Sequence, residues 1–134
     1  PDTHGEAGVV IYHFDSFCDY YYAGMQIDSV DGAVYVFLDQ HYQGTSTRLF
    51  NSSSPLFAYE FDRFYKFSVE LAYPDWQMSV FTATETFVFN YTDLSAATTD
   101  LSDSKYIGLK NTNTNISAKS LFVSDSPFFD SLPS

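Results

Sequence analysis

Short segments in which apolar and polar residues alternate recur along this chain, a pattern typical of β-strands with one buried face. Residues 66–71 alternate in this way, residues 76–80 repeat the period, and threonines at 82, 84 and 86 suit the solvent face of a strand. Further apolar runs lie at 9–14, 33–38, 87–89 and 121–123. Turn-forming residues separate these runs, at 51–55 and 111–115 above all. Short strands at a spacing of about ten residues predict an antiparallel sandwich or barrel, so the predicted fold class is all-β.

Composition supports one folded domain and excludes two kinds of partner. The chain has 134 residues, 45% of them hydrophobic and 19% aromatic, which suits a single domain with a substantial core. Its 17 acidic and 6 basic residues give a formal charge of −11. Such a surface repels phosphate backbones and anionic lipids, so we expect neither nucleic acid nor a membrane as partner, and self-repulsion favours a monomer. No apolar run reaches the roughly 18 residues of a membrane-spanning helix.

Processing signals leave the compartment open. The lone cysteine, Cys18, excludes an internal disulfide and a cysteine-based metal cluster. Residues 1–5 contain neither an initiator methionine nor a basic leader, so a processed or trimmed chain is expected. Asn-x-Ser/Thr sequons occur at Asn51, Asn90 and Asn115, and about one would arise by chance, so glycosylation and secretion are only mildly favoured.

One spacing in residues 37–44 is more specific. Phe37 is followed after four residues by a second aromatic residue, Tyr42, and then by one residue and Gly44. This spacing predicts a folded hairpin in which the ring of Phe37 covers the backbone and Gly44 supplies a positive φ. Ser68 lies 24 residues after Gly44, inside an alternating segment, from which it could hydrogen-bond to the hairpin. The arrangement resembles the Greek key signature of the βγ-crystallins.

A second, less complete unit follows downstream. Phe81 and Phe87 stand at the aromatic positions and Ser120 at the closing serine, whereas Val88 or Phe89 replaces the glycine. The resemblance implies a Greek key β-sandwich built from two crystallin-type motifs, at about 33–72 and 76–124. It also implies a domain at 33–134, with residues 1–32 as an N-terminal extension that adds a strand or packs on the domain.

Many microbial members of this family bind calcium through a D/N-D/N-x-x-S/T-S stretch, since Ca²⁺ needs six to eight oxygen ligands. The corresponding motif residues here are Arg63, Phe64, Phe67 and Ser68 in the first unit and Asn115, Ile116, Lys119 and Ser120 in the second. A cation or an apolar side chain cannot supply an oxygen, so we expect both sites to be degenerate. A register shift of two residues leaves Asn113 and Ser117 as candidate ligands of a weak residual calcium site. We expect no other metal and no cofactor.

The resemblance implies a non-enzymatic, soluble protein with a structural, storage or stress role. The calcium-poor motifs and the asymmetric second unit are similar to those of fungal crystallin-like proteins, which implies a developmental role in fruiting bodies. A calcium-binding crystallin is one alternative.

Two further alternatives come from the residues themselves. Tyr20, Tyr21 and Tyr22, with Tyr73 and Trp76, could form the aromatic platform of a glycan-binding module, although core packing is the favoured role. The carboxylate pairs Glu60/Asp62 and Asp100/Asp103 could serve a glycosidase, but isolated surface acids are much commoner. Histidines 4, 13 and 41 share no metal-binding spacing, and the chain has no nucleophile elbow, phosphate loop or zinc-protease motif.

Overall fold

The computed structural model describes residues 5–13, 16–28, 31–42, 44–60, 63–72, 75–93 and 106–112. These residues contain eight strands: β1 (Gly5–His13), β2 (Ser16–Ile27), β3 (Val34–Tyr42), β4 (Thr45–Asn51), β5 (Lys66–Ala72), β6 (Asp75–Phe81), β7 (Thr86–Thr92) and β8 (Tyr106–Thr112). The all-β prediction is confirmed. Within these residues no helix has the length and apolar character needed to cross a bilayer.

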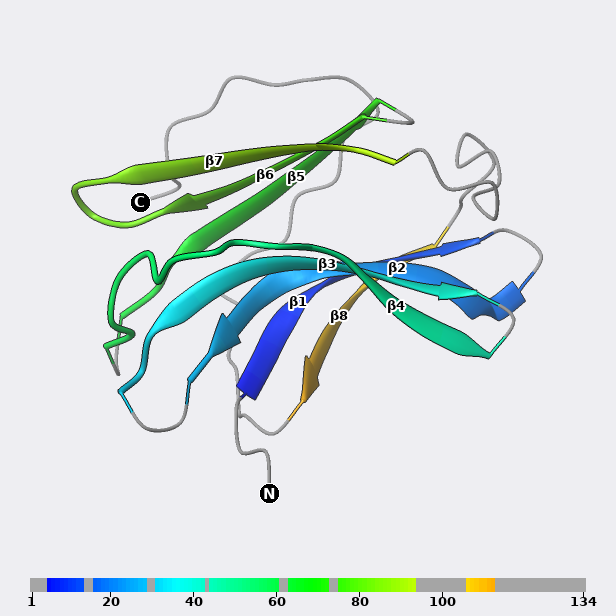
Figure 1. Cartoon of the computed structure of the whole chain (residues 1–134), viewed down its shortest axis with the longest axis horizontal. Coiled ribbons are helices and arrows are strands. Elements are labelled where there is room, and N and C mark those ends of the chain that lie inside the picture. The colour runs from blue at the N-terminus through cyan, green and yellow to red at the C-terminus, as the bar shows by residue number, and fades with distance from the viewer. Residues whose placement is uncertain are drawn as a thin grey trace.

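The strands form two antiparallel sheets. Five strands lie in the order β4-β3-β2-β1-β8, and three lie in the order β5-β6-β7. Figure 1 shows the three-stranded sheet as a layer above the five-stranded one. The chain therefore folds as two facing sheets, as in a β-sandwich, and it crosses between them after β4 and again after β7.

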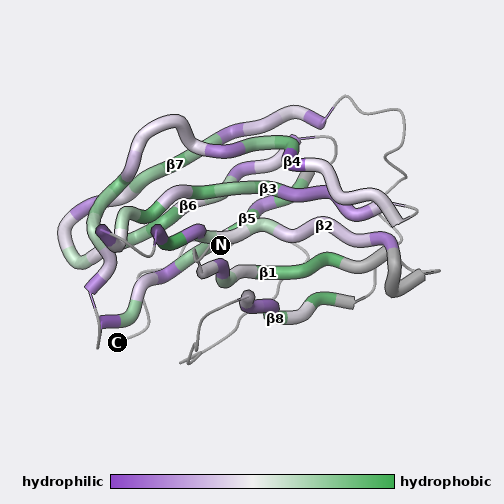
Figure 2. Tube along the Cα trace, turned by 60° about the horizontal axis from the view of Figure 1, so that its bottom comes forward, coloured by the Kyte–Doolittle hydropathy of each residue, from purple (hydrophilic) through white to green (hydrophobic). Residues whose placement is uncertain are grey.

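Apolar side chains from both sheets meet between the layers. Buried members are Tyr21, Ala23, Val36, Leu38, Trp76, Met78 and Val80, and partly buried neighbours include Phe67, Val69 and Leu71. The alternation predicted for residues 66–71 thus turns the apolar side of β5 towards the core. β3 has a different pattern: Figure 2 shows an apolar first part followed by polar residues.

The N-terminal segment lies within the larger sheet. β2 pairs with β3 from Tyr20 to Ile27, and β1 pairs with β2 on one side and with β8 on the other. Residues 1–32, predicted to be an extension, thus supply two strands between β3 and β8. The division of the chain at residue 32 stays a prediction.

The hairpin predicted at residues 37–44 is present. β3 and β4 pair antiparallel, and Tyr42 faces Thr45 across the turn. Gly44 has a φ of 80°, the left-handed conformation that glycine adopts without steric cost. Ser68 lies in β5, which belongs to the other sheet, and pairs there with Ser79 of β6. The hairpin and its glycine are confirmed, whereas their membership of a crystallin Greek key stays a prediction.

Candidate functional site

A polar cluster lies on the face of the five-stranded sheet that points away from β5–β7, called the outer face below. Strand register brings its members together: Glu6 of β1 pairs with Gln26 of β2, Tyr22 of β2 pairs with Asp39 of β3, and Asp39 pairs with Arg48 of β4. A β-bulge at Leu38/Asp39 sets this last pairing. Because a bulge shifts the alternation by one residue, it places Arg48 on the same face as Asp39.

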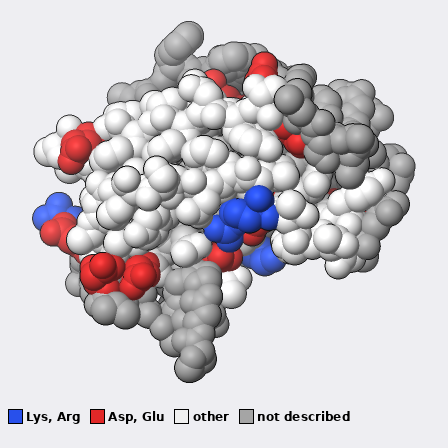
Figure 3. Space-filling view, viewed as in Figure 1, with Lys and Arg blue, Asp and Glu red and all other residues white. Residues whose placement is uncertain are grey.

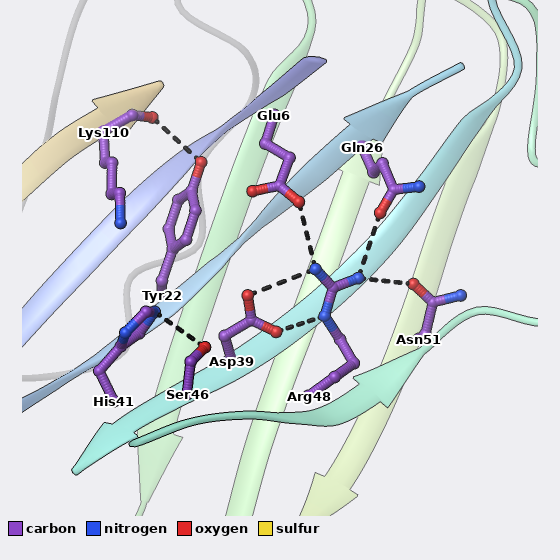
Figure 4. A network of polar contacts seen from close by, with 9 residues as sticks. All are labelled: Glu6, Tyr22, Gln26, Asp39, His41, Ser46, Arg48, Asn51 and Lys110. Atoms are coloured by element: carbon purple, nitrogen blue, oxygen red, sulfur yellow. Dashed lines mark hydrogen bonds and ion pairs between the residues drawn. The ribbon is translucent and has the colours of Figure 1, made fainter. Parts of the chain in front are cut away.

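Arg48 is the centre of this cluster (Figure 4). Its Nε and Nη2 donate to the two carboxylate oxygens of Asp39, with 3.3 Å between Nη2 and Oδ2. Nη1 donates to Oε1 of Gln26 at 3.2 Å and to Oδ1 of Asn51 at 3.0 Å, while Nη2 also donates to Oε2 of Glu6 at 3.2 Å. A guanidinium has five N–H donors, so all of them are used. One side chain therefore links four adjacent strands.

Burial makes this arrangement strong. The side chains of Asp39 and Glu6 are 11% and 12% exposed, against 34% for Arg48. Burial raises the pKa of Asp39, and the hydrogen bond and charge of Arg48 oppose that rise. The guanidinium also lies 4.4 Å from the centroid of the Phe37 ring. A bidentate ion pair stacked on an aromatic face uses the geometry that distinguishes arginine from lysine.

Aromatic rings fill the rest of the outer face. Phe37 and Tyr22 are fully buried and pack edge to face, with centroids 4.9 Å apart. Nζ of Lys110 lies 4.9 Å from the Tyr22 ring and donates a hydrogen bond to Tyr20 Oη at 3.0 Å. Burial, followed by the charge of Glu6, raises the pKa of Tyr22 well above its usual range. The cationic side chains of Arg48 and Lys110 thus cover the rings of this face. Cationic atoms also lie next to carboxylates near the centre of the surface drawn in Figure 3.

His41 lies at one end of the cluster. Its ring stacks on Tyr20 with 4.2 Å between centroids and 15° between planes, and its Nε2 is 3.5 Å from Oγ of Ser46. Burial lowers the pKa of His41, and the charge of Lys110 lowers it further. The neutral ring is therefore the form that the folded protein prefers.

Acidification through the titration of His41 is expected to reduce stability. Because the folded pKa lies below the ordinary value of about 6.5, the unfolded chain binds the proton more tightly, and the free energy of unfolding falls as the pH drops below that value. Asp39 has the opposite effect at lower pH: because its pKa is raised in the folded protein, its protonation increases the free energy of unfolding. Between about pH 7.5 and 5.5, the melting temperature of His41→Gln should fall less than that of the natural chain. Parallel melting curves over this range would contradict the assignment.

Core packing, the role favoured over an aromatic platform, is confirmed for two of the aromatic residues. Tyr21 and Trp76 lie in the core, 5% and 1% exposed, with ring centroids 4.9 Å apart. The hydroxyl of Tyr21 donates to Oδ2 of the buried Asp93 at 2.6 Å and accepts from Nε2 of Gln40 at 3.0 Å. Strand alternation is the reason, since it sends Tyr20 and Tyr22 to the outer face and Tyr21 inwards. Tyr73 lies outside the described residues.

Those of the remaining predicted site residues that the structure describes are dispersed. Phe67 and Phe87 pack against the core, and Phe81 ends β6, where it pairs with Thr86. Phe64 is 65% exposed, and Arg63 forms an ion pair with Glu60. The following predicted residues lie outside the described part of the chain: Asp62, Asp100, Asp103, Asn113, Asn115, Ile116, Ser117, Lys119 and Ser120.

A shallow hollow lies on the exposed side of the three-stranded sheet. Its volume is about 310 Å³. Gln77 and Asn90 face each other across β6 and β7, and Gln77 Nε2 donates to Asn90 Oδ1 at 3.1 Å. Two residues further along each strand, on the same face, Thr92 donates to Oδ1 of Asp75 at 2.8 Å. The complete lining is Glu70, Asp75, Trp76, Gln77, Asn90, Tyr91 and Thr92.

Neither the Arg48 cluster nor the hollow is signalled by a local sequence pattern, because their members are far apart in the chain. Over the described ranges, no group of three or more His, Cys, Asp or Glu side chains is placed to hold a metal ion. No protein-family model, curated protein or solved structure gives a significant match to this chain.

Proposed function

We propose that this chain is a non-enzymatic β-sandwich protein with a structural, storage or developmental role, as its resemblance to the βγ-crystallins implies. The observation that carries the proposal is the use of all five N–H donors of Arg48 within the protein. A group that acts on a substrate must offer it an atom, whereas these donors are directed at acceptors on four strands. This polar cluster thus serves to hold the sheet together.

The crystallin part of the proposal rests on the hairpin. Tyr42 and Gly44 occupy the turn region as the motif requires, and Gly44 has the positive φ. Each of the two proposed units also divides its strands between the sheets. β3 and β4 lie in one sheet and β5 in the other, while β6 and β7 lie in one sheet and β8 in the other. The missing glycine of the second unit is the main departure from the motif.

We also propose that the calcium motif of the first unit is non-functional. The side chains at its ligand positions are engaged elsewhere, since Arg63 pairs with Glu60 and Phe67 packs in the core. Neither can contribute the oxygen that Ca²⁺ requires.

Thermal melts in millimolar calcium and in chelator are expected to coincide. If a calcium site were present, free calcium at a hundred times its Kd would raise the free energy of unfolding by about 2.7 kcal/mol. For a domain of this length, that gain would raise the melting temperature by roughly 6–12 °C. Circular dichroism follows the transition, with magnesium as the control for non-specific screening of the acidic surface. A shift of this size in calcium alone would overturn the proposal and indicate a calcium-binding crystallin.

A further inference from the structure

Two of the three Asn-x-Ser/Thr sequons, at Asn51 and Asn90, lie in different surroundings in the folded protein. The sequence alone could not say which of them is the better glycosylation site. Asn51 belongs to the Arg48 cluster: its Oδ1 accepts from Arg48 at 3.0 Å, and its Nδ2 donates to the carbonyl oxygen of Ser52 at 3.0 Å. A sugar on this amide would have to share the outer face with the ion network. Asn115 lies outside the described residues.

Asn90 is in a different position. It lies in β7, its side chain is exposed, and it lines the shallow hollow of the three-stranded sheet. Its Oδ1 accepts from Gln77, and in the described part of the chain its Nδ2 makes no hydrogen bond. The third residue of this sequon, Thr92, is held by Asp75 on the neighbouring strand. The amide nitrogen is therefore presented to solvent on a rigid strand.

The lining of the hollow matches the surface of a sugar. Glu70 and Asp75 offer carboxylate acceptors, and the amides of Gln77 and Asn90 offer both donors and acceptors. Hydroxyl and N-acetyl groups of a pyranose need both kinds of partner. The volume of about 310 Å³ lies at the lower end of the range for small-molecule sites.

We propose that Asn90 is an N-glycosylation site when the chain passes through a secretory pathway, and that the first sugar of its glycan lies in this hollow. The donor is an N-acetylglucosamine-based oligosaccharide linked to a lipid diphosphate. Nδ2 of Asn90 attacks C1 of the first sugar. The C1–O bond breaks and its electron pair leaves with the lipid diphosphate, a C1–N bond forms, and the proton lost by the amide passes to solvent. The resulting glycan projects from the exposed side of β5–β7, away from the Arg48 cluster.

Occupancy is tested by secreting the full chain from a eukaryotic host and mapping its peptides before and after digestion with an amidase that releases N-glycans. The natural chain should carry a glycan at Asn90 and none at Asn51. Asn90→Gln and Thr92→Ala should both lose it. Asp75→Ala is the matched control, because it removes the acceptor of the Thr92 hydrogen bond but keeps the sequon, and it should stay glycosylated. An unmodified Asn90, or occupancy at Asn51 in the secreted protein, would overturn the proposal.

The position of the first sugar is tested by stability. The glycosylated protein should melt about 2–5 °C above the enzymatically deglycosylated one, the size expected from one or two added hydrogen bonds. Gln77→Ala should keep the glycan but reduce this difference, whereas Lys66→Ala, at the far end of the same sheet, should leave it unchanged. Equal melting temperatures with and without glycan in the natural chain would show that the sugar does not use the hollow.

Discussion

Replacing Gly8 by alanine is expected to prevent stable folding, with a loss of more than about 4 kcal/mol in the free energy of unfolding. Gly8 of β1 faces Gly24 of β2. A Cβ built on Gly8 would lie 2.1 Å from the carbonyl oxygen of Ala23 and 2.6 Å from Cα of Gly24. Both are backbone atoms, so only a separation of the two strands could relieve the clash, and close-packed interiors resist such movements.

Gly108→Ala is the matched control for this experiment. Gly108 lies in β8, on the other side of β1, and a Cβ built on it would meet nothing within 4 Å. We expect its stability to stay within about 0.5 kcal/mol of the natural chain in urea denaturation. The comparison also tests the N-terminal segment: a Gly8→Ala protein with an unchanged urea midpoint would mean that β1 and β2 do not approach as described.

Replacing Arg48 by alanine is expected to lower the free energy of unfolding by about 2–4 kcal/mol. The variant would leave two mostly buried carboxylates, Asp39 and Glu6, without their shared cation. The estimate stays below that for a fully buried pair because the side chain of Arg48 is 34% exposed and solvent screens it. The deficit should shrink in acid, since burial raises the pKa of Asp39 and protonation of that carboxylate removes one uncompensated charge.

Two further variants separate charge from geometry. Arg48→Lys keeps the positive charge but cannot form the bidentate pair, so it should lose about half as much stability as Arg48→Ala. Asp39→Ala combined with Arg48→Ala should be less destabilising than the sum of the single changes, because the buried carboxylate is removed together with its partner. Strictly additive effects would contradict the linkage of these two residues.

Local sequence pattern predicted the strands better than it predicted their ends. Residues 66–71 alternate and form β5, and residues 76–80 do so in β6. The threonines at 82 and 84, in contrast, lie in the turn between β6 and β7, where Thr82 Oγ1 accepts hydrogen bonds from the backbone N–H groups of Thr84 and Glu85. The same side chain suits a strand surface and a turn, and the choice depends on the backbone hydrogen bond available nearby.

The polar stretch after the apolar run of β3 shows why the candidate site was missed. Asp39, Gln40 and His41 continue the strand because each finds a distant partner: Arg48, Tyr21 and Tyr20, respectively. Arg48 contacts Glu6, 42 residues away in the chain. Its only signal in the sequence is that it is one of few cations in an acidic chain.

The sequence by itself determined the all-β class and the buried face of strands such as β5 and β6, because a period of two residues depends only on neighbours along the chain. It also determined the β3–β4 hairpin, whose Gly44 is a local requirement of the turn. The tertiary structure alone decided that Tyr21 points into the core while Tyr20 and Tyr22 point to the outer face. It also decided that Arg48 joins four strands, and that Asn51 binds Arg48 whereas Asn90 binds Gln77 on the other sheet. These outcomes depend on strand register, and register is fixed only when both sheets pack on a common core.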